Sequence, residues 1–278
     1  MNLCGEIASA ADAFQINNTR RLKEGAMVAI VLAAGYATRL YPITIDTPKT
    51  LLKIGGKPIL EHILEKIGEL ECVAETVIIS NDKFYGHFLE WKKGYSANQK
   101  REEHNRADII ILNDGSTSEE TRLGAIGDIR FAIEELSIDD EVMIIAGDNF
   151  FTYRLTGLLD FYRRMDADCI VVKKLQDREM LRRFGVAVVG PDFRVIDFEE
   201  KPKEPKSDLA VFATYIYKRD TLPLIKEYLD GGNPKDAPGN FPAWLYKRKR
   251  VVAYAFEGDC YDIGTPEAYR DICAMYEK

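Results

Sequence analysis

The sequence lacks the long apolar segments and the excess of positive charge that mark two large classes of protein. Its longest unbroken apolar run, residues 26–34, has nine residues, whereas a membrane-spanning helix needs roughly 18. Its 38 Lys and Arg residues are outnumbered by 45 Asp and Glu residues, which gives a net charge of −7. We therefore expect no membrane association. We also expect no nucleic-acid partner, because such binding usually requires a basic surface.

Cysteine and histidine are also scarce, with five and three residues, respectively. The cysteines (Cys4, Cys72, Cys169, Cys260 and Cys273) are far apart and include no C-x-x-C pair. This spacing argues against a disulfide framework or a zinc site and favours reduced thiols. The first residues lack a basic segment followed by an apolar stretch, so we expect no secretory signal and a cytoplasmic protein.

Apolar residues nevertheless make up 46% of the chain, enough for a sizeable core. From residue 27 onward, short apolar runs alternate with amphipathic stretches. This alternation predicts an α/β fold with a Rossmann-like, mainly parallel sheet that has helices on both faces. The expected strands are 27–33, 76–79, 109–112, 142–146 and 169–172, and the expected helices are 58–70, 123–136 and 155–165.

The pattern changes after residue 172. Strand-like segments at 185–189, 194–198 and 209–217 are separated by turn residues, which predicts a small β-rich insertion with a hairpin. A helix at 221–229, a strand at 251–256 and a closing helix at 265–275 are expected to follow. Residues 1–26 are mostly polar and aperiodic, so we predict an N-terminal appendage there and one domain over 27–278.

A turn of small residues follows the first predicted strand, within the segment Leu32-Ala33-Ala34-Gly35-Tyr36-Ala37-Thr38-Arg39-Leu40. Ligands of parallel sheets bind beyond the carboxyl ends of the strands, and small residues there let the backbone approach a phosphate. Arg39 and, ten residues later, Lys49 could hold a polyphosphate. The segment matches neither the P-loop nor the dinucleotide fingerprint. An ordinary loop with two surface bases remains the alternative.

Two aspartates are candidate metal ligands. Asp148, in Gly147-Asp148-Asn149, follows a predicted buried strand and should face the same crevice as the first loop. Mg²⁺ commonly takes only one or two protein carboxylates together with substrate phosphates. Asp262 precedes Gly264-Thr265-Pro266, three residues that are typical of the turn and first positions of a helix. The start of a helix does not account for Asp262, which could be a second ligand. A simple strand-ending turn is the alternative at Asp148.

A further motif, Glu199-Glu200-Lys201-Pro202, stands at the end of a predicted strand. Neighbouring residues of a strand point to opposite faces unless the strand ends there, and Pro202 suggests that it does. Because Lys203, Glu204 and Lys206 follow, a solvated charge cluster is the alternative to a binding site.

Together these motifs resemble the sugar-1-phosphate nucleotidyltransferase family, particularly the glucose-1-phosphate thymidylyl- and uridylyltransferases. The family's first motif, L-A-G/A-G-x-G-T-R-L/M-x-P-x-T followed by P-K, is similar to residues 32–44 and Pro48-Lys49. Its later motifs G-D-N/G, E-K-P and D-x-G-T-P correspond to segments that begin at Gly147, Glu200 and Asp262, in the expected order. The similarity covers about residues 27–275.

The resemblance implies a fold of the nucleotide-diphospho-sugar transferase type, with a catalytic domain at 27–278 and a sugar-binding role for the β-rich insertion. It implies transfer of a nucleotidyl group from an NTP, with dTTP or UTP favoured, to a sugar-1-phosphate, with Mg²⁺ as cofactor. The products would be an NDP-sugar and pyrophosphate. CTP- or GTP-dependent transfer to another phosphorylated sugar or alcohol stays open, as do a non-catalytic nucleotide-sugar-binding regulatory subunit and a homo-oligomer.

The resemblance also implies roles for individual residues. Two catalytic cations would neutralise the reacting phosphates: Arg39, which would hold the departing β- and γ-phosphates, and Lys49. The remaining roles concern binding. The nucleotide would contact Leu32, Ala33, Ala34, Gly35, Asn113 (or Asp114 beside it) and Gly124; the sugar phosphate would contact Gly185, Glu200 and Lys201; and Mg²⁺ would bind Asp148 and Asp262.

The sequence departs from the family pattern at two points. Ala37 replaces the second glycine of G-x-G-T-R, so it would be strained if that position needs a positive φ. Otherwise its methyl group narrows the loop or shifts the base preference. Phe212-Ala213-Thr214-Tyr215 replaces a segment that often contains a small residue or Asn before Gly, which leaves the sugar open. Because the chain ends soon after the helix at 265–275, we expect no second, acyltransferase domain.

Overall fold

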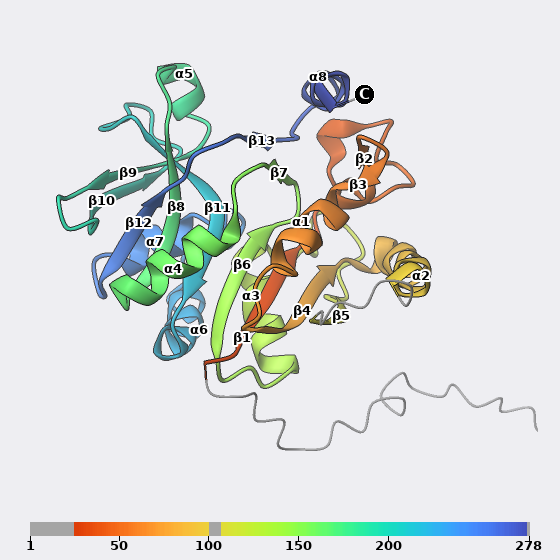
Figure 1. Cartoon of the computed structure of the whole chain (residues 1–278), viewed down its shortest axis with the longest axis horizontal. Helices are drawn as coiled ribbons and strands as arrows, with labels where there is room; N and C mark the ends of the chain where they lie inside the picture. Colours follow the sequence, from red (N-terminus) through yellow and green to blue (C-terminus); the bar gives the residue numbers. More distant parts are fainter. Residues whose placement is uncertain (1–24, 100–106, 277–278) are drawn as a thin grey trace, which may run out of the picture.

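The computed structural model describes residues 25–99 and 107–276 (Figure 1). Its centre is a nine-stranded sheet with the order β10-β9-β11-β6-β1-β4-β5, in which β8 pairs with β11 and β12 pairs with β8. The appendage predicted for residues 1–26 lies outside the described residues except for Gly25 and Ala26. Among the helices of the described ranges, none combines the length and the apolarity that crossing a bilayer would require.

The amino-terminal half of the sheet is parallel, as the sequence predicted. Strand β1 (Met27–Leu32) lies between β6 (Glu141–Ala146) and β4 (Val73–Ser80), and β5 (Asp108–Asn113) pairs with β4. All three pairings are parallel. Residues Met27–Val31 of β1 are buried, which explains why this strand reads as an unbroken apolar run rather than as an alternating one.

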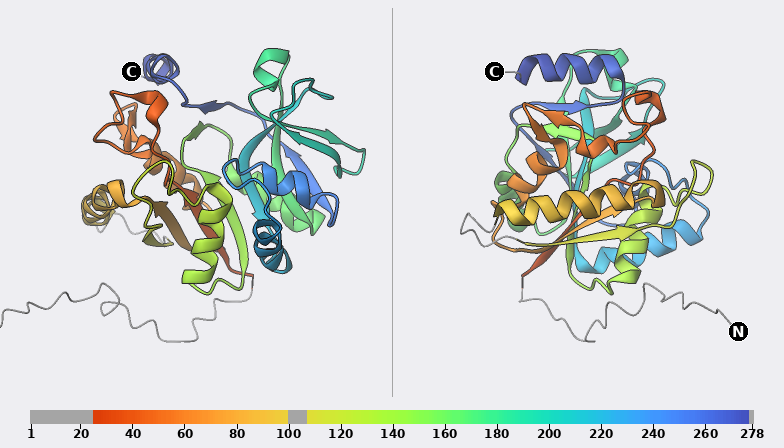
Figure 2. Two further views of the ribbon diagram at one scale, coloured as in Figure 1. Left: turned by 180° about the vertical axis from the view of Figure 1, so that it is seen from behind. Right: turned by 90° about the vertical axis from the view of Figure 1, so that its right-hand side faces the viewer.

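Helices cover both faces of this sheet. Met27, Ala29 and Val31 of β1 belong to one apolar core, which includes side chains of α1 (Ile59–Ile67), α2 (Asp82–Gln99) and α4 (Leu155–Met165). Val28 and Ile30 belong to the opposite core, with α3 (Ala125–Glu135), α6 (Leu222–Asp230) and α7 (Asn240–Leu245). Accordingly, α1 (orange) faces the viewer in Figure 1 and α3 (yellow-green) faces the viewer in the left panel of Figure 2.

The β-rich part joins the parallel strands through β11 (Leu209–Tyr217), which runs antiparallel to β6. The first part of this same edge of β11 pairs with β9 (Gly185–Val189), and the opposite edge of β11 pairs with β8 (Asp168–Lys174). Strand β9 forms the predicted hairpin with β10 (Val195–Glu200), and the short helix α5 (Arg178–Leu181) precedes it. The last strand of this half, β12 (Val251–Ala255), is parallel to β8.

The chain then returns from the β-rich half to the parallel half (Figure 1). The short strand β13 (Cys260–Asp262) pairs with β7 (Asn149–Phe151), which directly follows β6. Helix α8 (Pro266–Tyr276) begins beyond it, and the Thr265 hydroxyl caps the helix by accepting a hydrogen bond from the Ala268 amide at 3.2 Å. The helix packs on the hairpin of β2 (Lys53–Ile54) and β3 (Lys57–Pro58).

Helix α2 is the main element to which the sequence analysis assigned no structure. Its aromatic residues Phe84, Phe88, Trp91 and Tyr95 recur at intervals of four, three and four, which is the spacing of a helical stripe. Phe84 and Phe88 are fully buried, and the Trp91 indole donates a hydrogen bond to Glu61 at 2.9 Å. The spacing of these aromatic residues was therefore sufficient to predict a helix here.

The described cysteines, Cys72, Cys169, Cys260 and Cys273, are free thiols, and Cys4 lies outside the described residues. Cys169 is fully buried in β8 within the apolar core. It behaves there as a small apolar side chain.

Ala37 adopts a left-handed backbone conformation, with φ 50° and ψ 40°. The position therefore requires a positive φ, and the replacement of glycine by alanine places a Cβ where L-residues are disfavoured by about 1–2 kcal/mol. The Ala37 carbonyl accepts hydrogen bonds from the Leu40 amide and the Thr44 hydroxyl, which hold the turn in this form.

We predict that Ala37→Gly raises the free energy of unfolding by about 0.5–1 kcal/mol, because glycine relieves the left-handed strain but gains entropy in the unfolded chain. Urea denaturation of the purified protein measures the change. As a matched control, Ala243→Gly within α7 should lower the stability by about 1 kcal/mol. Destabilisation by both substitutions would contradict the assignment of strain to Ala37.

Candidate active site

A cleft of about 800 Å³ opens at the carboxyl ends of the parallel strands and extends to the β-rich half. It is lined by residues that follow β1 and β6 and by residues of β9, β10 and β11. All but one of the site residues predicted from the sequence line it: Leu32, Ala33, Ala34, Gly35, Arg39, Lys49, Gly124, Asp148, Gly185, Glu200, Lys201 and Asp262. The fold thus gathers residues that are more than 200 positions apart in the chain.

The loop after β1 is held by hydrogen bonds to the end of β4 and to the residue that follows it. The Ala33 amide donates to the Ile79 carbonyl at 3.0 Å, and the Asn81 side chain donates to the Ala34 carbonyl at 2.9 Å. Beyond the left-handed Ala37, a short 3₁₀ turn buries Leu40 and leaves the Arg39 side chain exposed at the cleft. The local fold therefore fixes the direction of Arg39.

The two predicted metal-binding carboxylates lie on either side of one ammonium group. Lys49 Nζ is 2.9 Å from Asp148 Oδ2 and 3.8 Å from Asp262 Oδ1. The pairing of β7 with β13 produces this arrangement, because it sets Asn149 opposite Asp262 and so brings Asp148 beside it. Gly147, just before Asp148, lets the end of β6 pack closely on the end of β1, since a Cβ there would lie 2.7 Å from the Leu32 carbonyl oxygen.

The two carboxyl groups differ in their affinity for protons. Loss of hydration inside the cleft would raise the pKa of Asp148. The charge of Lys49 and its hydrogen bond, helped by a backbone hydrogen bond and the charge of Arg39, outweigh this effect and lower the pKa. Burial and the negative charge of Asp148 raise the pKa of Asp262, despite the opposing charge of Lys49. Each carboxyl group therefore depends on positive charge placed between them.

These two residues fit a hard divalent cation with few protein ligands. Both offer carboxylate oxygens, and both already lie within reach of one shared cation, the Lys49 ammonium. Within residues 25–99 and 107–276, no group of three or more His, Cys, Asp or Glu side chains is arranged to hold a metal. A site of this kind suits Mg²⁺, which commonly completes its coordination with water and substrate phosphates.

The β-rich wall places Glu200 between two glycines. Strand β10 ends at Glu200, which pairs with Gly185 on β9. A Cβ at Gly185 would come within 2.8 Å of Glu200 Oε2, and a Cβ at Gly239 would also crowd this carboxylate. The two glycines therefore leave room for the carboxylate as it stands, and burial raises the pKa of Glu200, with Lys201 opposing. Lys201 has a φ of 49°, so the backbone leaves the extended conformation of β10 at this residue.

Exposed cations line the cleft from both walls. Arg39 belongs to the parallel half, and Arg183 and Lys201 belong to the β-rich half. In the described part of the chain none of the three forms an ion pair with a carboxylate. Unpaired cations that converge on one cleft favour an anionic ligand. The sequence analysis missed Arg183, although it stands two residues before the predicted Gly185.

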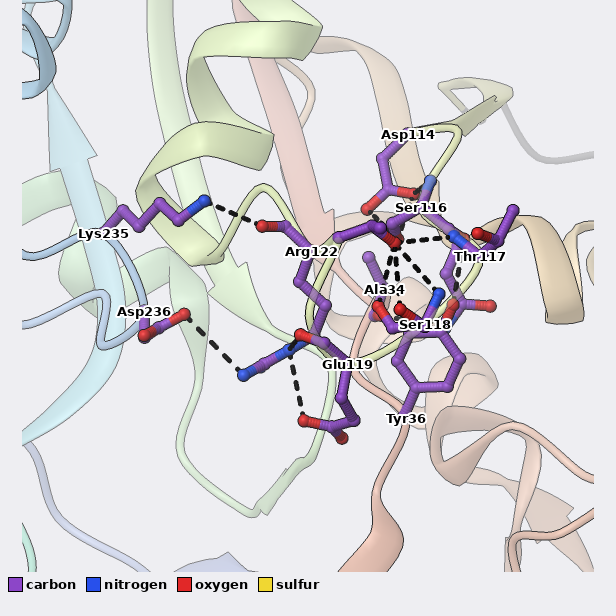
Figure 3. A network of polar contacts seen from close by, with 12 residues as sticks. Ala34, Tyr36, Asp114, Ser116, Thr117, Ser118, Glu119, Arg122, Lys235 and Asp236 are labelled. Atoms are coloured by element: carbon purple, nitrogen blue, oxygen red, sulfur yellow. Dashed lines mark hydrogen bonds and ion pairs between the residues drawn. The ribbon is translucent and has the colours of Figure 1, made fainter.

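At the far end of the cleft, a segment from the β-rich half reaches the start of α3 (Figure 3). The Lys235 carbonyl accepts from the Ile126 amide at 3.0 Å, and Lys235 Nζ donates to the Arg122 carbonyl at 2.9 Å. Arg122 also lies 3.3 Å from Glu119 and 3.8 Å from Asp236. Gly124 has a φ of 79°, and a Cβ there would lie 2.8 Å from the Lys235 carbonyl oxygen, so this end requires glycine.

Asn113 is the one predicted site residue that does not line the cleft. Its side chain donates to Asp82 at 2.8 Å and accepts from the Gly115 amide at 3.0 Å. The adjacent Asp114 lines the cleft instead. Its carboxylate accepts hydrogen bonds from the Ser116 amide and hydroxyl, each at 2.7 Å (Figure 3).

Asp128 is a second cleft residue that the sequence analysis missed. It lies on α3, where the neighbouring inward positions Ile126, Ile129 and Ala132 are apolar and buried. Its side chain lines the cleft, is only 6% exposed, and Oδ1 has no hydrogen-bond partner among the described residues. Burial, reinforced by the charge of Asp114, raises the pKa of Asp128 to about 8. An acid on an apolar helix face was the signal available in the sequence.

Comparison with known proteins shows where this chain belongs. A family model described as nucleotidyl transferase matches residues 28–278. The glucose-1-phosphate adenylyltransferase of Fusobacterium nucleatum is 29% identical over 266 residues, which cover 90% of this chain and 66% of that protein. The UTP–glucose-1-phosphate uridylyltransferase AglF of Haloferax volcanii is 28% identical over 195 residues, covering 69% and 72%, respectively.

The fold is also shared with solved structures. A UDP-glucose pyrophosphorylase complexed with UDP-glucose has a TM-score of 0.75 and 23% identity, and the match covers 90% of this chain and 98% of that one. At this identity the likeness concerns the fold. The chain spans between 52% and 66% of the length of three of the curated relatives it matches.

We predict that Asp128→Asn stabilises the protein increasingly as the pH rises. An Asp in an unfolded chain titrates near 3.9, whereas the pKa of Asp128 in the folded protein is about 8. Between these values the folded protein retains a proton that the unfolded chain has lost, so the stability contributed by Asp128 falls as the pH rises. Asparagine does not ionise and escapes this loss.

Urea denaturation at pH 5 and pH 8 measures the effect. The stability difference between Asp128→Asn and the wild type should grow by up to about 4 kcal/mol over this range. The exposed Asp160 on α4 supplies the control, since Asp160→Asn should give a nearly constant difference. A pH-independent difference for Asp128→Asn would show that the acid is not held in its neutral form.

Proposed function

Because the chain belongs to the nucleotidyl transferase family, we propose that it transfers a nucleotidyl group from an NTP to a sugar-1-phosphate. The products are an NDP-sugar and pyrophosphate. The observation that carries this proposal is the distribution of charge in the cleft. Lys49 lies between two carboxylates, and Arg39, Arg183 and Lys201 line the same space.

The reaction is a substitution at the α-phosphorus of the NTP. A phosphate oxygen of the sugar-1-phosphate forms a new P–O bond in line, and the bond from the α-phosphorus to the bridging oxygen breaks, so that pyrophosphate leaves with the electron pair. The attacking phosphate is already an anion near neutral pH, so no strong general base is required. The barrier comes from bringing two polyanions together, which positioning and local positive charge reduce.

In this proposal the two walls of the cleft bind different parts of the substrates. Arg39, directed into the cleft by the turn after Ala37, holds the departing β- and γ-phosphates. Lys49 neutralises charge at the reacting centre. Lys201 binds the sugar phosphate, and the Glu200 carboxylate, for which no hydrogen bond or ion pair with a described residue is found, accepts hydrogen bonds from sugar hydroxyls.

Asp148 and Asp262 are the residues that would hold Mg²⁺. Bound there, the ion would neutralise negative charge on the phosphates. With an ion held there, the Lys49 ammonium would no longer have to compensate both carboxylates and could contact a phosphate oxygen. The proposal is supported by the shared position of the two carboxylates around one cation.

The choice of base and sugar is part of the same proposal. The family resemblance favours dTTP or UTP, while the names of the similar proteins include both an adenylyltransferase and a uridylyltransferase. Of the residues that depart from the family pattern, Ala37, Phe212, Ala213 and Tyr215 line the cleft. They therefore stand where they can influence the two substrates.

Pyrophosphate release tests the proposed reaction directly. The purified protein is incubated with each pair from a panel of five NTPs, dTTP included, and several sugar-1-phosphates, with Mg²⁺ or with a chelator. We expect release with a small subset of pairs and none with the chelator. Absence of release from every pair would refute the enzymatic function. Full activity with the chelator would refute the requirement for Mg²⁺.

We predict that Asp148→Asn lowers kcat at least about 100-fold, since it removes charge from the centre where phosphates react. The variant should keep its circular dichroism spectrum, because the side chain lies at the cleft and is 44% exposed. Calorimetry should also show weaker Mg²⁺ binding, which is a readout independent of turnover. Asp160→Asn is the control and should keep wild-type kinetics. Wild-type activity in Asp148→Asn would remove this residue from the mechanism.

A further inference from the structure

Asp128 is a buried acid for which the proposed chemistry has no use. It lies one turn into α3, counted from Gly124, and its amide donates to the Gly124 carbonyl at 2.8 Å. The side chain lines the cleft, although it is 94% buried, and Oδ1 has no partner among the described residues. A buried polar atom without a hydrogen bond is destabilising. Such an atom in a ligand cleft points to a partner supplied by the ligand.

Charged groups from three segments influence this carboxyl group. Asp114 directly follows β5, Arg122 precedes α3, and Lys235 belongs to the segment that crosses from the β-rich half. Burial favours the protonated form of Asp128, and so do the negative charge of Asp114 and a side-chain hydrogen bond with it; the charges of Arg122 and Lys235 oppose protonation, and the resulting pKa is about 8. At neutral pH the group is mainly a carboxylic acid. In this form it has one O–H donor, which can hydrogen-bond either to Asp114 or to a ligand, and one acceptor oxygen beside it.

The position of Asp128 separates it from the reacting phosphates. Asp148 follows β6, whereas Asp114, which adjoins Asp128, follows β5. These strands are three steps apart in the sheet order β6-β1-β4-β5. At a strand spacing of about 4.8 Å this is roughly 14 Å. A nucleotide whose phosphates lie near Arg39 and Lys49 would extend its base toward Asp128.

We propose that Asp128 is a specificity-determining residue that hydrogen-bonds the edge of the nucleobase, at a point where an N–H group stands beside an acceptor atom. This inference rests on the proposed function in assigning the cleft to an NTP. The base supplies the partner that Oδ1 lacks, and the acid O–H pairs with the adjacent acceptor. Rotation of the carboxyl group about χ2 is broad and nearly two-fold, so either oxygen can turn toward the ligand.

Two substitutions at Asp128 test whether its hydrogen-bonding groups are needed for binding. Asp128→Asn keeps a neutral donor beside an acceptor, whereas Asp128→Ala removes both. Inorganic triphosphate is the probe for the phosphate part of the site, because it carries the three phosphates of an NTP without the nucleoside. Calorimetry measures the affinity of the wild type and of both variants for triphosphate and for each NTP of the panel, in the same Mg²⁺-containing buffer.

We expect Asp128→Ala to weaken binding of the preferred NTP roughly tenfold while leaving triphosphate binding within about twofold. Asp128→Asn should stay within about threefold of the wild type for both ligands. The melting temperature of Asp128→Ala should be no lower than that of the wild type, because the substitution removes an unpartnered buried group. Unchanged NTP affinity in Asp128→Ala would overturn the inference, and so would an equal loss for NTP and triphosphate.

The design keeps this inference distinct from the proposed function. A wild-type protein that binds an NTP but releases no pyrophosphate would refute the transferase reaction, while the affinities of the variants would still decide the role of Asp128. A wild-type protein that binds none of the NTPs would overturn both.

Discussion

The ammonium of Lys49 between the carboxylates of Asp148 and Asp262 is the interaction around which the rest of the cleft is arranged. Two carboxylates held this close repel each other unless a cation lies between them. The contact joins a 3₁₀ turn after the first loop to the crossing strands β7 and β13, and those strands in turn connect the parallel half of the sheet to the β-rich half. The same two carboxylates are the groups that would hold Mg²⁺ in the proposed function.

Several features of the cleft destabilise the folded protein and would be compensated by a bound ligand. Arg39, Arg183 and Lys201 point positive charge at one space, and Asp128 is buried with an oxygen that has no partner in the described structure. The left-handed Ala37 adds backbone strain beside them. Stable packing elsewhere, in the two cores on the faces of β1, compensates for these local costs. Concentration of such costs in one cleft is typical of a functional site.

Much of the fold could be predicted because it follows from local patterns. The buried strand β1, helix α4 and the β9–β10 hairpin were anticipated from apolar runs, helical periodicity and turn residues. Helix α2 was missed although its aromatic stripe has helical spacing. Most predicted site residues do line one cleft, because motifs at strand ends share an edge of the sheet. Asn113 does not, since its side chain is engaged by Asp82 and Gly115.

The sequence by itself determined which segments become strands and turns, and which of them carry cations and carboxylates, since these properties depend on residues close together in the chain. Only the tertiary structure decided that Lys49 meets an aspartate 99 residues away, that Lys235 reaches the start of α3, and that Asp128 is buried beside Asp114. Burial and charge pairing depend on which distant segments pack together. That choice is made by the whole core, so no local pattern records it.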